Sequence, residues 1–150
     1  MRIATFNCNS VRSRLDTVLG WLADYAPDVL CLQETKVQDA EFPADAFRLA
    51  GWQVAFQGEK SYNGVALVSK AAPDAVTFGL DSDPADPTRL VHARFGKIHV
   101  VNTYVPQGRE IDHAMYAYKL AWLARLKKYF QKKIGADAPL LWCGDLNVAR

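Results

Sequence analysis

Polar side chains that can bind a cation or a phosphate stand at the ends of several apolar segments of this 150-residue sequence. They are carboxylates, carboxamides and one phenol, namely Asn7, Asn9, Glu34, Asn102, Tyr104, Asp145 and Asn147. Carboxylate oxygens hold Mg²⁺ or Mn²⁺ with few protein contacts and leave open positions for water and phosphate. Amide and phenol donors can then bind a phosphodiester while the metal offsets charge that develops on oxygen. These residue types together predict a metal-dependent site for phosphodiester chemistry.

Each of these residues also has a structural explanation when it is taken alone. Glu34 fits the first solvated residue after a buried strand, and Asp145 fits the cap of a turn. Asn7 and Asn102 fit hydrogen bonds to loop backbone, and Tyr104 fits a strand aromatic with a surface hydroxyl. The functional interpretation is favoured because the residues occupy equivalent places at the ends of separate strands, where open α/β sheets bind ligands.

Short apolar runs predict the strands that must position these side chains. A first strand is predicted at residues 2–6, and the continuous apolar run at 29–32 is typical of a strand buried on both faces. Apolar residues at helical spacing predict a helix between them, over residues 15–25. Further elements are predicted as strands at 52–56, 65–68, 90–95, 98–104 and 139–143 and a long helix at about 114–134. This order predicts an α/β fold with a mixed sheet and helices on at least one face.

The composition indicates a folded, water-soluble chain. It is 50% hydrophobic and 23% charged, with a net charge of +2, which excludes an intrinsically disordered protein. No apolar run reaches the roughly 18 residues of a membrane span, and the start does not resemble a signal peptide, so we expect a cytoplasmic protein without a membrane partner. Cys8, Cys31 and Cys143 are odd in number and lie in apolar runs, which favours reduced, buried thiols.

Other kinds of site find little support. The sequence has no phosphate-binding loop motif, no dinucleotide-binding glycine motif and no structural zinc spacing. His92 and His99 are interpreted as packing or surface residues, and His113 as a structural residue at the start of the long helix. The basic residues between Arg125 and Lys133 are interpreted as a solvated helix face, with nucleic-acid binding as the less favoured alternative.

Five segments resemble, in order, the exonuclease III family of bacterial DNA-repair nucleases, a branch of the endonuclease/exonuclease/phosphatase superfamily. They are TFNCNSVR (5–12), LQETK (32–36), YNGVA (62–66), NTYVPQG (102–108) and GDLN (144–147). The resemblance runs along the whole chain. It implies a deoxyribonuclease I-like four-layer sandwich, in which two sheets lie between helices.

The resemblance also implies roles for individual residues. Glu34 is similar to the principal metal-binding carboxylate, with Asn7 beside it. Tyr104 is similar to the phenol that contacts the scissile phosphate or orients the nucleophile, and Asp145 to the carboxylate that positions or deprotonates the attacking water. Asn147 is similar to the amide that steadies this carboxylate and the phosphate. The metal would be Mg²⁺ or Mn²⁺. Residues that match DNA-backbone contacts of the family are Asn9, Arg12, Lys36, Tyr62, Asn63 and Arg109.

The implied activities are incision of double-stranded DNA 5′ to an abasic site and removal of nucleotides from 3′ ends, with no obligate protein partner. The family pattern continues past GDLN to a Ser-Asp-His segment that this sequence lacks. We therefore expect residues 1–150 to be the N-terminal portion of one domain, truncated before a second half that supplies the facing sheet. Two alternatives are a catalytically silent fragment that binds DNA or metal, and a superfamily phosphodiesterase for a non-DNA substrate such as an inositol phosphate or a lipid.

Overall fold

Two four-stranded sheets form the centre of the computed structural model, which describes residues 1–148. The first sheet has the order β1 (Ile3–Asn7), β2 (Val29–Gln33), β4 (Tyr62–Ser69) and β3 (Gln53–Glu59). The second has the order β5 (Ala75–Phe78), β6 (Leu90–Phe95), β7 (Ile98–Tyr104) and β8 (Leu140–Asp145). The pairs β1–β2 and β7–β8 are parallel and the other pairs are antiparallel, so both sheets are mixed, as expected.

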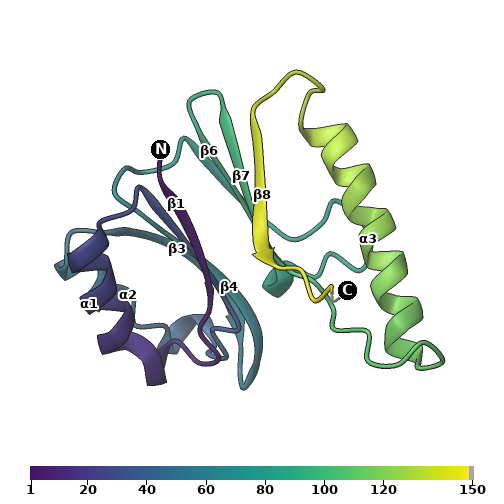
Figure 1. Cartoon of the computed structure of the whole chain (residues 1–150), viewed down its shortest axis with the longest axis horizontal. Coiled ribbons are helices and arrows are strands. Elements are labelled where there is room, and N and C mark those ends of the chain that lie inside the picture. The colour runs from purple at the N-terminus through teal and green to yellow at the C-terminus, as the bar shows by residue number, and fades with distance from the viewer. Residues whose placement is uncertain (149–150) are drawn as a thin grey trace.

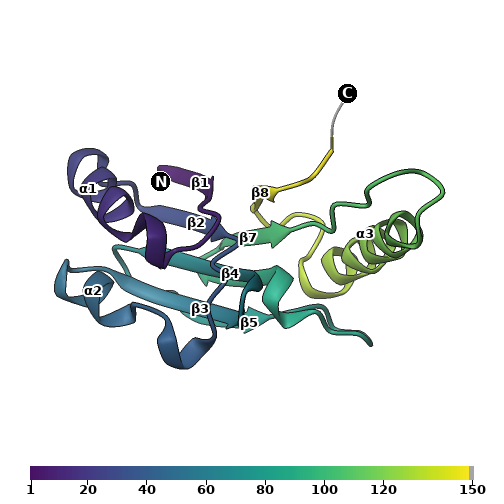
Figure 2. The same ribbon diagram turned by 90° about the horizontal axis from the view of Figure 1, so that it is seen from below.

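Helices cover the outer face of each sheet (Figures 1 and 2). The helices α1 (Leu15–Tyr25) and α2 (Ala44–Leu49) lie on the first sheet, and α3 (Ala114–Lys133) lies on the second. The described residues also form three short 3₁₀ segments: η1 (Arg12–Arg14), η2 (Asp39–Glu41) and η3 (Pro87–Arg89). The layers therefore run helix, sheet, sheet, helix, which confirms the expected four-layer sandwich. No helix within the described residues is long and apolar enough to cross a bilayer.

Three apolar clusters hold these layers together. Val18 and Leu22 of α1 pack on the first sheet, and Trp122 and Leu126 of α3 pack on the second. Between the sheets lie Val29, Cys31, Val65, Leu67, Val91, Ala93 and Val100, all of them buried. Successive strand residues face opposite sides, so the buried strands β2 and β4 supply side chains to two clusters.

The expectation that a second half of the domain would supply the facing sheet is wrong. Residues 75–104 and 140–145 form that sheet themselves. The apolar runs at 90–95 and 98–104 were correctly predicted as strands, but one-dimensional patterns do not say which strands pair. The sequence analysis also missed the six-residue α2 and the four-residue β5, which are too short for a clear periodic signal.

The parallel pairs bring four strand ends to one side of the sandwich. β1 and β8 are the neighbouring edge strands of the two sheets and run in the same direction (Figure 1). Asn7 and Asp145 are the last residues of these strands, Glu34 follows β2, and Tyr104 ends β7. The fold thereby collects the polar residues that end separate segments of the sequence.

Candidate active site

The Asn7 side chain joins two carboxylates that come from different sheets. Its amide nitrogen donates to Glu34 Oε1 at 2.7 Å and to Asp145 Oδ2 at 2.8 Å. Its carbonyl oxygen accepts a hydrogen bond from the backbone nitrogen of Asn9 at 3.1 Å. Both amide protons of Asn7 are thus used to hold two negative groups together, although like charges repel at short range.

Lys36 neutralises the outer side of Glu34. Its ammonium group lies 2.8 Å from Glu34 Oε2 and donates to Asn9 Oδ1 at 2.5 Å. Partial burial alone would raise the pKa of the Glu34 carboxyl, but hydrogen bonds from Asn7, Lys36 and Tyr104 and the Lys36 charge lower the pKa below its ordinary value. Glu34 is therefore an ionised carboxylate at neutral pH.

An unusual backbone presents these side chains. Asn9, Glu34, Lys36 and Asn63 all have positive φ angles, between 41° and 53°. Such angles cost energy in non-glycine residues and persist where the surroundings hold them. Here the backbone nitrogen atoms of residues 10 and 11 bond to the carbonyls of residues 34 and 35, and the nitrogen atoms of residues 35 and 36 bond to those of residues 64 and 63. The Glu34 loop is thus clamped on both sides.

Gly64 makes one side of this clamp possible. Its φ is +94°, and a Cβ atom built there would lie 2.0 Å from Oγ1 of Thr35. Only glycine combines that backbone angle with such a close approach. The YNGVA segment therefore needs its glycine so that residues 34–36 can lie against β4.

Tyr104 faces Glu34 from the second sheet. Burial, followed by the nearby charge of Glu34, raises the pKa of the Tyr104 phenol to about 12. The hydroxyl keeps its proton at neutral pH and donates it in a hydrogen bond to Glu34. This is the state in which a phenol binds an anionic oxygen.

The turn after β8 fixes Asp145 and Asn147. The Asn147 backbone nitrogen donates to Asp145 Oδ1 at 3.1 Å, and its side chain donates to the Val105 carbonyl at 2.8 Å. Lys119 of α3 donates to the Asn147 carbonyl at 2.5 Å. Asp145 is consequently bonded on one oxygen by Asn7 and on the other by Asn147.

A polar cleft of about 510 Å³ contains most of the predicted residues. Those in its lining are Asn7, Asn9, Glu34, Lys36, Tyr62, Asn63 and Tyr104, and Asp145 joins them through Asn7. Arg12 and Arg109 are outside the lining. The Arg12 guanidinium pairs with Glu41 at 2.9 Å, and Arg109 lies in an exposed loop with φ of 57°.

The sequence analysis missed two residues around the cleft. Gln107 lines it and lies within the NTYVPQG segment, so its motif was a usable signal. Lys119 is one lysine among several on α3, and no pattern distinguished it. Asn102 was expected at a strand end, but it lies within β7, two residues before its last residue, and has a different role. It is fully buried and donates to the carbonyls of Leu32 and Ala66 in the opposite sheet, at 2.9 and 3.0 Å.

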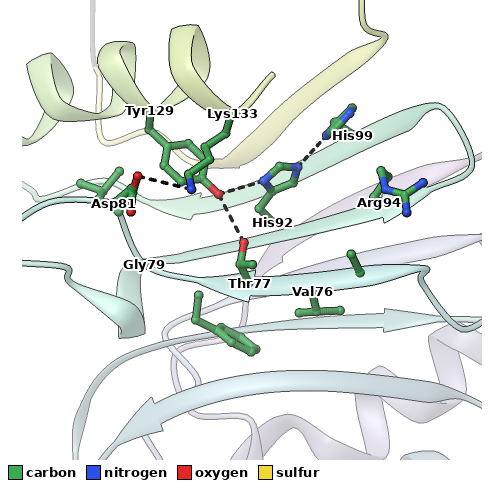
Figure 3. A pocket seen from close by; sticks show the side chains of 12 residues that line it. Val76, Thr77, Gly79, Asp81, His92, Arg94, His99, Tyr129 and Lys133 are labelled. Atoms are coloured by element: carbon green, nitrogen blue, oxygen red, sulfur yellow. Dashed lines mark hydrogen bonds and ion pairs between the residues drawn. The ribbon is translucent and has the colours of Figure 1, made fainter. Parts of the chain in front are cut away.

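A second cavity, of about 280 Å³, lies on the outer face of the second sheet (Figure 3). His92 Nε2 lies 2.8 Å from His99 Nδ1, and His92 Nδ1 lies 2.8 Å from the Tyr129 hydroxyl. Both histidines are thus hydrogen-bonded residues in an outer layer, in line with the packing or surface role predicted for them. His113 accepts a hydrogen bond from the backbone nitrogen of Met115 and caps α3, as a structural residue would.

The donor atoms of the cleft suit a hard cation. Glu34 and Asp145 offer carboxylate oxygens, Tyr104 offers a phenol, and the Asn7 amide nitrogen lies between the two carboxylates. Within residues 1–148 there is no cluster of three or more histidine, cysteine, aspartate or glutamate side chains that could enclose a metal. Few protein oxygens and open space are what Mg²⁺ uses when it keeps several water ligands. The cleft fits such an ion better than a structural zinc.

Comparisons with known proteins agree on one family. Residues 4–150 match the model of the Endonuclease/Exonuclease/phosphatase family. The chain is 32% identical over 155 residues to the exodeoxyribonuclease III of Haemophilus influenzae, covering 99% of this chain and 58% of that protein. It is also 32% identical to the DNA-(apurinic or apyrimidinic site) endonuclease of Dictyostelium discoideum, of which it covers 42%. The chain therefore spans about half the length of these relatives.

Solved structures show the same fold. An AP endonuclease from Archaeoglobus fulgidus superimposes with a TM-score of 0.96 and 52% identity, covering 99% of this chain and 58% of that one. The 3′-5′ exonuclease NExo from Neisseria meningitidis gives a TM-score of 0.94 and 39% identity, covering 99% and 59%. The strand pairing and layers described above are thus those of solved nuclease structures.

Proposed function

This chain belongs to the endonuclease/exonuclease/phosphatase family, and we propose that its cleft hydrolyses phosphodiester bonds in DNA as part of DNA repair. The proposal is supported by relatives that are named exodeoxyribonuclease III and apurinic/apyrimidinic endonuclease. The proposed substrates are double-stranded DNA with an abasic site and DNA 3′ ends. A non-DNA phosphodiester is less favoured, because these relatives are named for DNA.

One observation carries the proposal: the amide of Asn7 holds Glu34 and Asp145 at 2.7 and 2.8 Å. In metal-dependent hydrolysis of a phosphodiester, one carboxylate can bind the cation while a second, nearby carboxylate accepts a proton from water. An amide between them fixes that spacing and offsets part of their repulsion. A purely structural surface cluster has no need for a carboxylate from each sheet.

Glu34 and Asn7 are the proposed metal-binding residues, with Mg²⁺ or Mn²⁺ as the ion. When bound, this ion would stabilise the negative charge that develops on the phosphate and the leaving oxygen. Glu34 is ionised and lines the cleft, which supports this role. Lys36 already pairs with Glu34 and supplies a positive charge that attracts the phosphate backbone.

The other proposed catalytic residues act on water and phosphate. Asp145 accepts the proton of the attacking water, and Asn147 keeps that carboxylate oriented through its backbone nitrogen. Tyr104 donates its hydroxyl proton in a hydrogen bond to a phosphate oxygen, for which its raised pKa keeps it protonated. Water then attacks in line with the 3′-oxygen that leaves.

Six further residues are proposed to bind the DNA backbone. Asn9, Lys36, Tyr62 and Asn63 are supported by their places in the cleft lining. Arg12 and Arg109 have weaker support, because neither lines the cleft; they would meet DNA on its flanks. We also propose that this chain is active without further residues, although it covers only 58% of the Haemophilus influenzae relative.

Incision of an end-labelled duplex with one abasic site tests the proposal. We expect cleavage with Mg²⁺, loss of cleavage with EDTA, and a decrease of about 100-fold or more in Glu34→Gln and Asp145→Asn. Asp45→Asn is the matched control, because Asp45 is an exposed carboxylate of α2 that pairs with Arg48. Cleavage that resists EDTA and survives Glu34→Gln contradicts the proposal. Binding of the duplex without cleavage would favour the alternative of a silent DNA-binding chain.

A further inference from the structure

Tyr104 has a cationic neighbour outside the cleft lining. The guanidinium carbon of Arg89 lies 5.0 Å from the centre of the Tyr104 ring, over its face. Nη1 of the same guanidinium donates to the Tyr104 backbone carbonyl at 3.2 Å. One side chain thus contacts both the ring and the main chain of a proposed catalytic residue. Arg89 is half-buried and ends η3, directly before β6.

Arg89 is itself held by an ion-paired brace. Its backbone nitrogen bonds to the Asp86 carbonyl at 3.0 Å. The Asp86 carboxylate accepts hydrogen bonds from two side chains of α3, the Tyr118 hydroxyl at 2.7 Å and the Arg125 guanidinium at 3.0 Å. The Asp86 and Arg125 side chains are each only 16% exposed, so solvent screens this pair less than a surface pair. Arg125 therefore ties the η3 segment to the helix.

This arrangement restrains the ring of Tyr104 in two ways. A cation over an aromatic face is attracted by the negative face of the ring, and the bond to the carbonyl fixes the main chain from which the ring projects. The hydroxyl of Tyr104 then stays aimed at the side of the cleft where Glu34 lies.

We propose that Arg89 is a positioning residue for Tyr104, holding the phenol toward the phosphate-binding side of the cleft. The expected change in kinetics rests on the proposed function. The restraint of the Tyr104 ring by Arg89 does not. The competing explanation is that Arg89 binds a DNA phosphate directly. The two explanations predict different changes in kinetics and in salt dependence.

The kinetic test compares Arg89→Met, which keeps an apolar chain without charge, with Arg89→Lys and with Arg94→Met. Arg94 is the matched control, because it lies on the adjacent strand β6 and pairs with Asp74. If Arg89 positions Tyr104, kcat falls about tenfold or more in Arg89→Met, with KM nearly unchanged. Arg89→Lys then recovers part of the lost kcat, and Arg94→Met keeps the wild-type kcat and KM. The proposal would be overturned in favour of direct binding if Arg89→Met raised KM and if the salt dependence of its DNA affinity fell by about one phosphate contact.

A second measurement does not depend on activity. In the chain with ¹³C-labelled tyrosine, the Tyr104 ring resonance is assigned by its loss in Tyr104→Phe. We expect Arg89→Met to shift this resonance while the tyrosine resonances other than that of Tyr118, which binds the same Asp86 brace, stay in place, and Arg94→Met to shift none. An unmoved Tyr104 resonance in a folded Arg89→Met protein rejects the positioning role. If the wild-type chain cleaves no DNA but the resonance shifts as expected, the proposed function fails while the positioning by Arg89 stands.

Discussion

The amide nitrogen of Asn7 lies 2.8 Å from Oδ2 of Asp145, although 138 residues separate the two in the sequence. Asn7 ends the edge strand of the first sheet and Asp145 ends the neighbouring edge strand of the second. The bond therefore closes the cleft only when both sheets have formed and have the correct relative position. This makes the geometry of the proposed active site a consequence of how the two sheets pack.

Removing this amide should damage activity more than stability. We expect Asn7→Ala to lower the rate of incision about 100-fold, because Glu34 and Asp145 lose the donor that spaces them. The free energy of unfolding should fall by only about 1–2 kcal/mol, since the site is partly solvated. Asn7→Asp keeps the shape but adds a third carboxylate, and it should be less active and less stable than Asn7→Ala. Incision assays and urea unfolding of both variants measure these effects, and an active Asn7→Asp protein would contradict the expectation.

Gly64 should tolerate no side chain. In Gly64→Ala the new methyl group would meet Thr35 Oγ1 at 2.0 Å, so the Glu34 loop must move. We expect a loss of more than about 2 kcal/mol in unfolding free energy, together with reduced incision. Gly96→Ala is the matched control. Its φ is also positive, at +60°, but within the described part of the chain no atom lies within 4 Å of the new Cβ, so it should cost only about 1 kcal/mol. Equal losses in the two variants would show that close approach is unimportant.

Asn102 should contribute to stability as the buried bond between sheets. Asn102→Leu removes the two side-chain bonds to the carbonyls of Leu32 and Ala66 and the acceptor for Gln33 at 2.6 Å, all of them buried. We expect urea unfolding to report a loss of about 3 kcal/mol or more. Thr35→Val provides the control, because the Thr35 hydroxyl is buried without a hydrogen-bond partner among residues 1–148. That variant should be no less stable than the wild type, because it removes a buried polar atom that makes no hydrogen bond within the described residues. A mild Asn102→Leu variant would disprove the bonding role.

His92 should make the protein less stable in acid. Burial, with the nearby His99, lowers the pKa of His92 from its ordinary 6.5 to about 4. The unfolded state therefore binds more protons than the folded state between pH 6.5 and 4, and stability falls as the pH decreases through this window. The slope from His92 is at most about 1.4 kcal/mol per pH unit, and less because the side chain is partly solvated.

Urea unfolding at several pH values from 7 to 4 checks this expectation. His92→Phe should flatten the pH dependence, although the charged groups near His92 (Asp81, Arg94 and Lys133, Figure 3) remain. His113→Asn is the control, because asparagine also caps helices and His113 lies at the exposed start of α3. An unchanged slope in His92→Phe would assign the acid sensitivity to other groups.

Sequence patterns were sufficient for local features. Apolar runs located the strands around Asn7, Glu34, Tyr104 and Asp145, because a buried strand and its polar end are adjacent in the chain. The same patterns identified the long helix at 114–134, which the structure has at Ala114–Lys133. The segment motifs supported the family assignment, and most of the proposed site residues line one cleft.

Other features depend on pairs of residues that are distant in sequence. The facing sheet within this chain, the buried bonds of Asn102, the amide bridge of Asn7 and the cation of Arg89 over Tyr104 were not predicted. Each of these features depends on strand register and on the way the two sheets pack. A pattern of residue types along one segment does not encode either of them. The sequence by itself determined which chemical groups stand at the strand ends. Only the tertiary structure decided which of them meet, because long-range packing sets the distances on which hydrogen bonds and charge interactions depend.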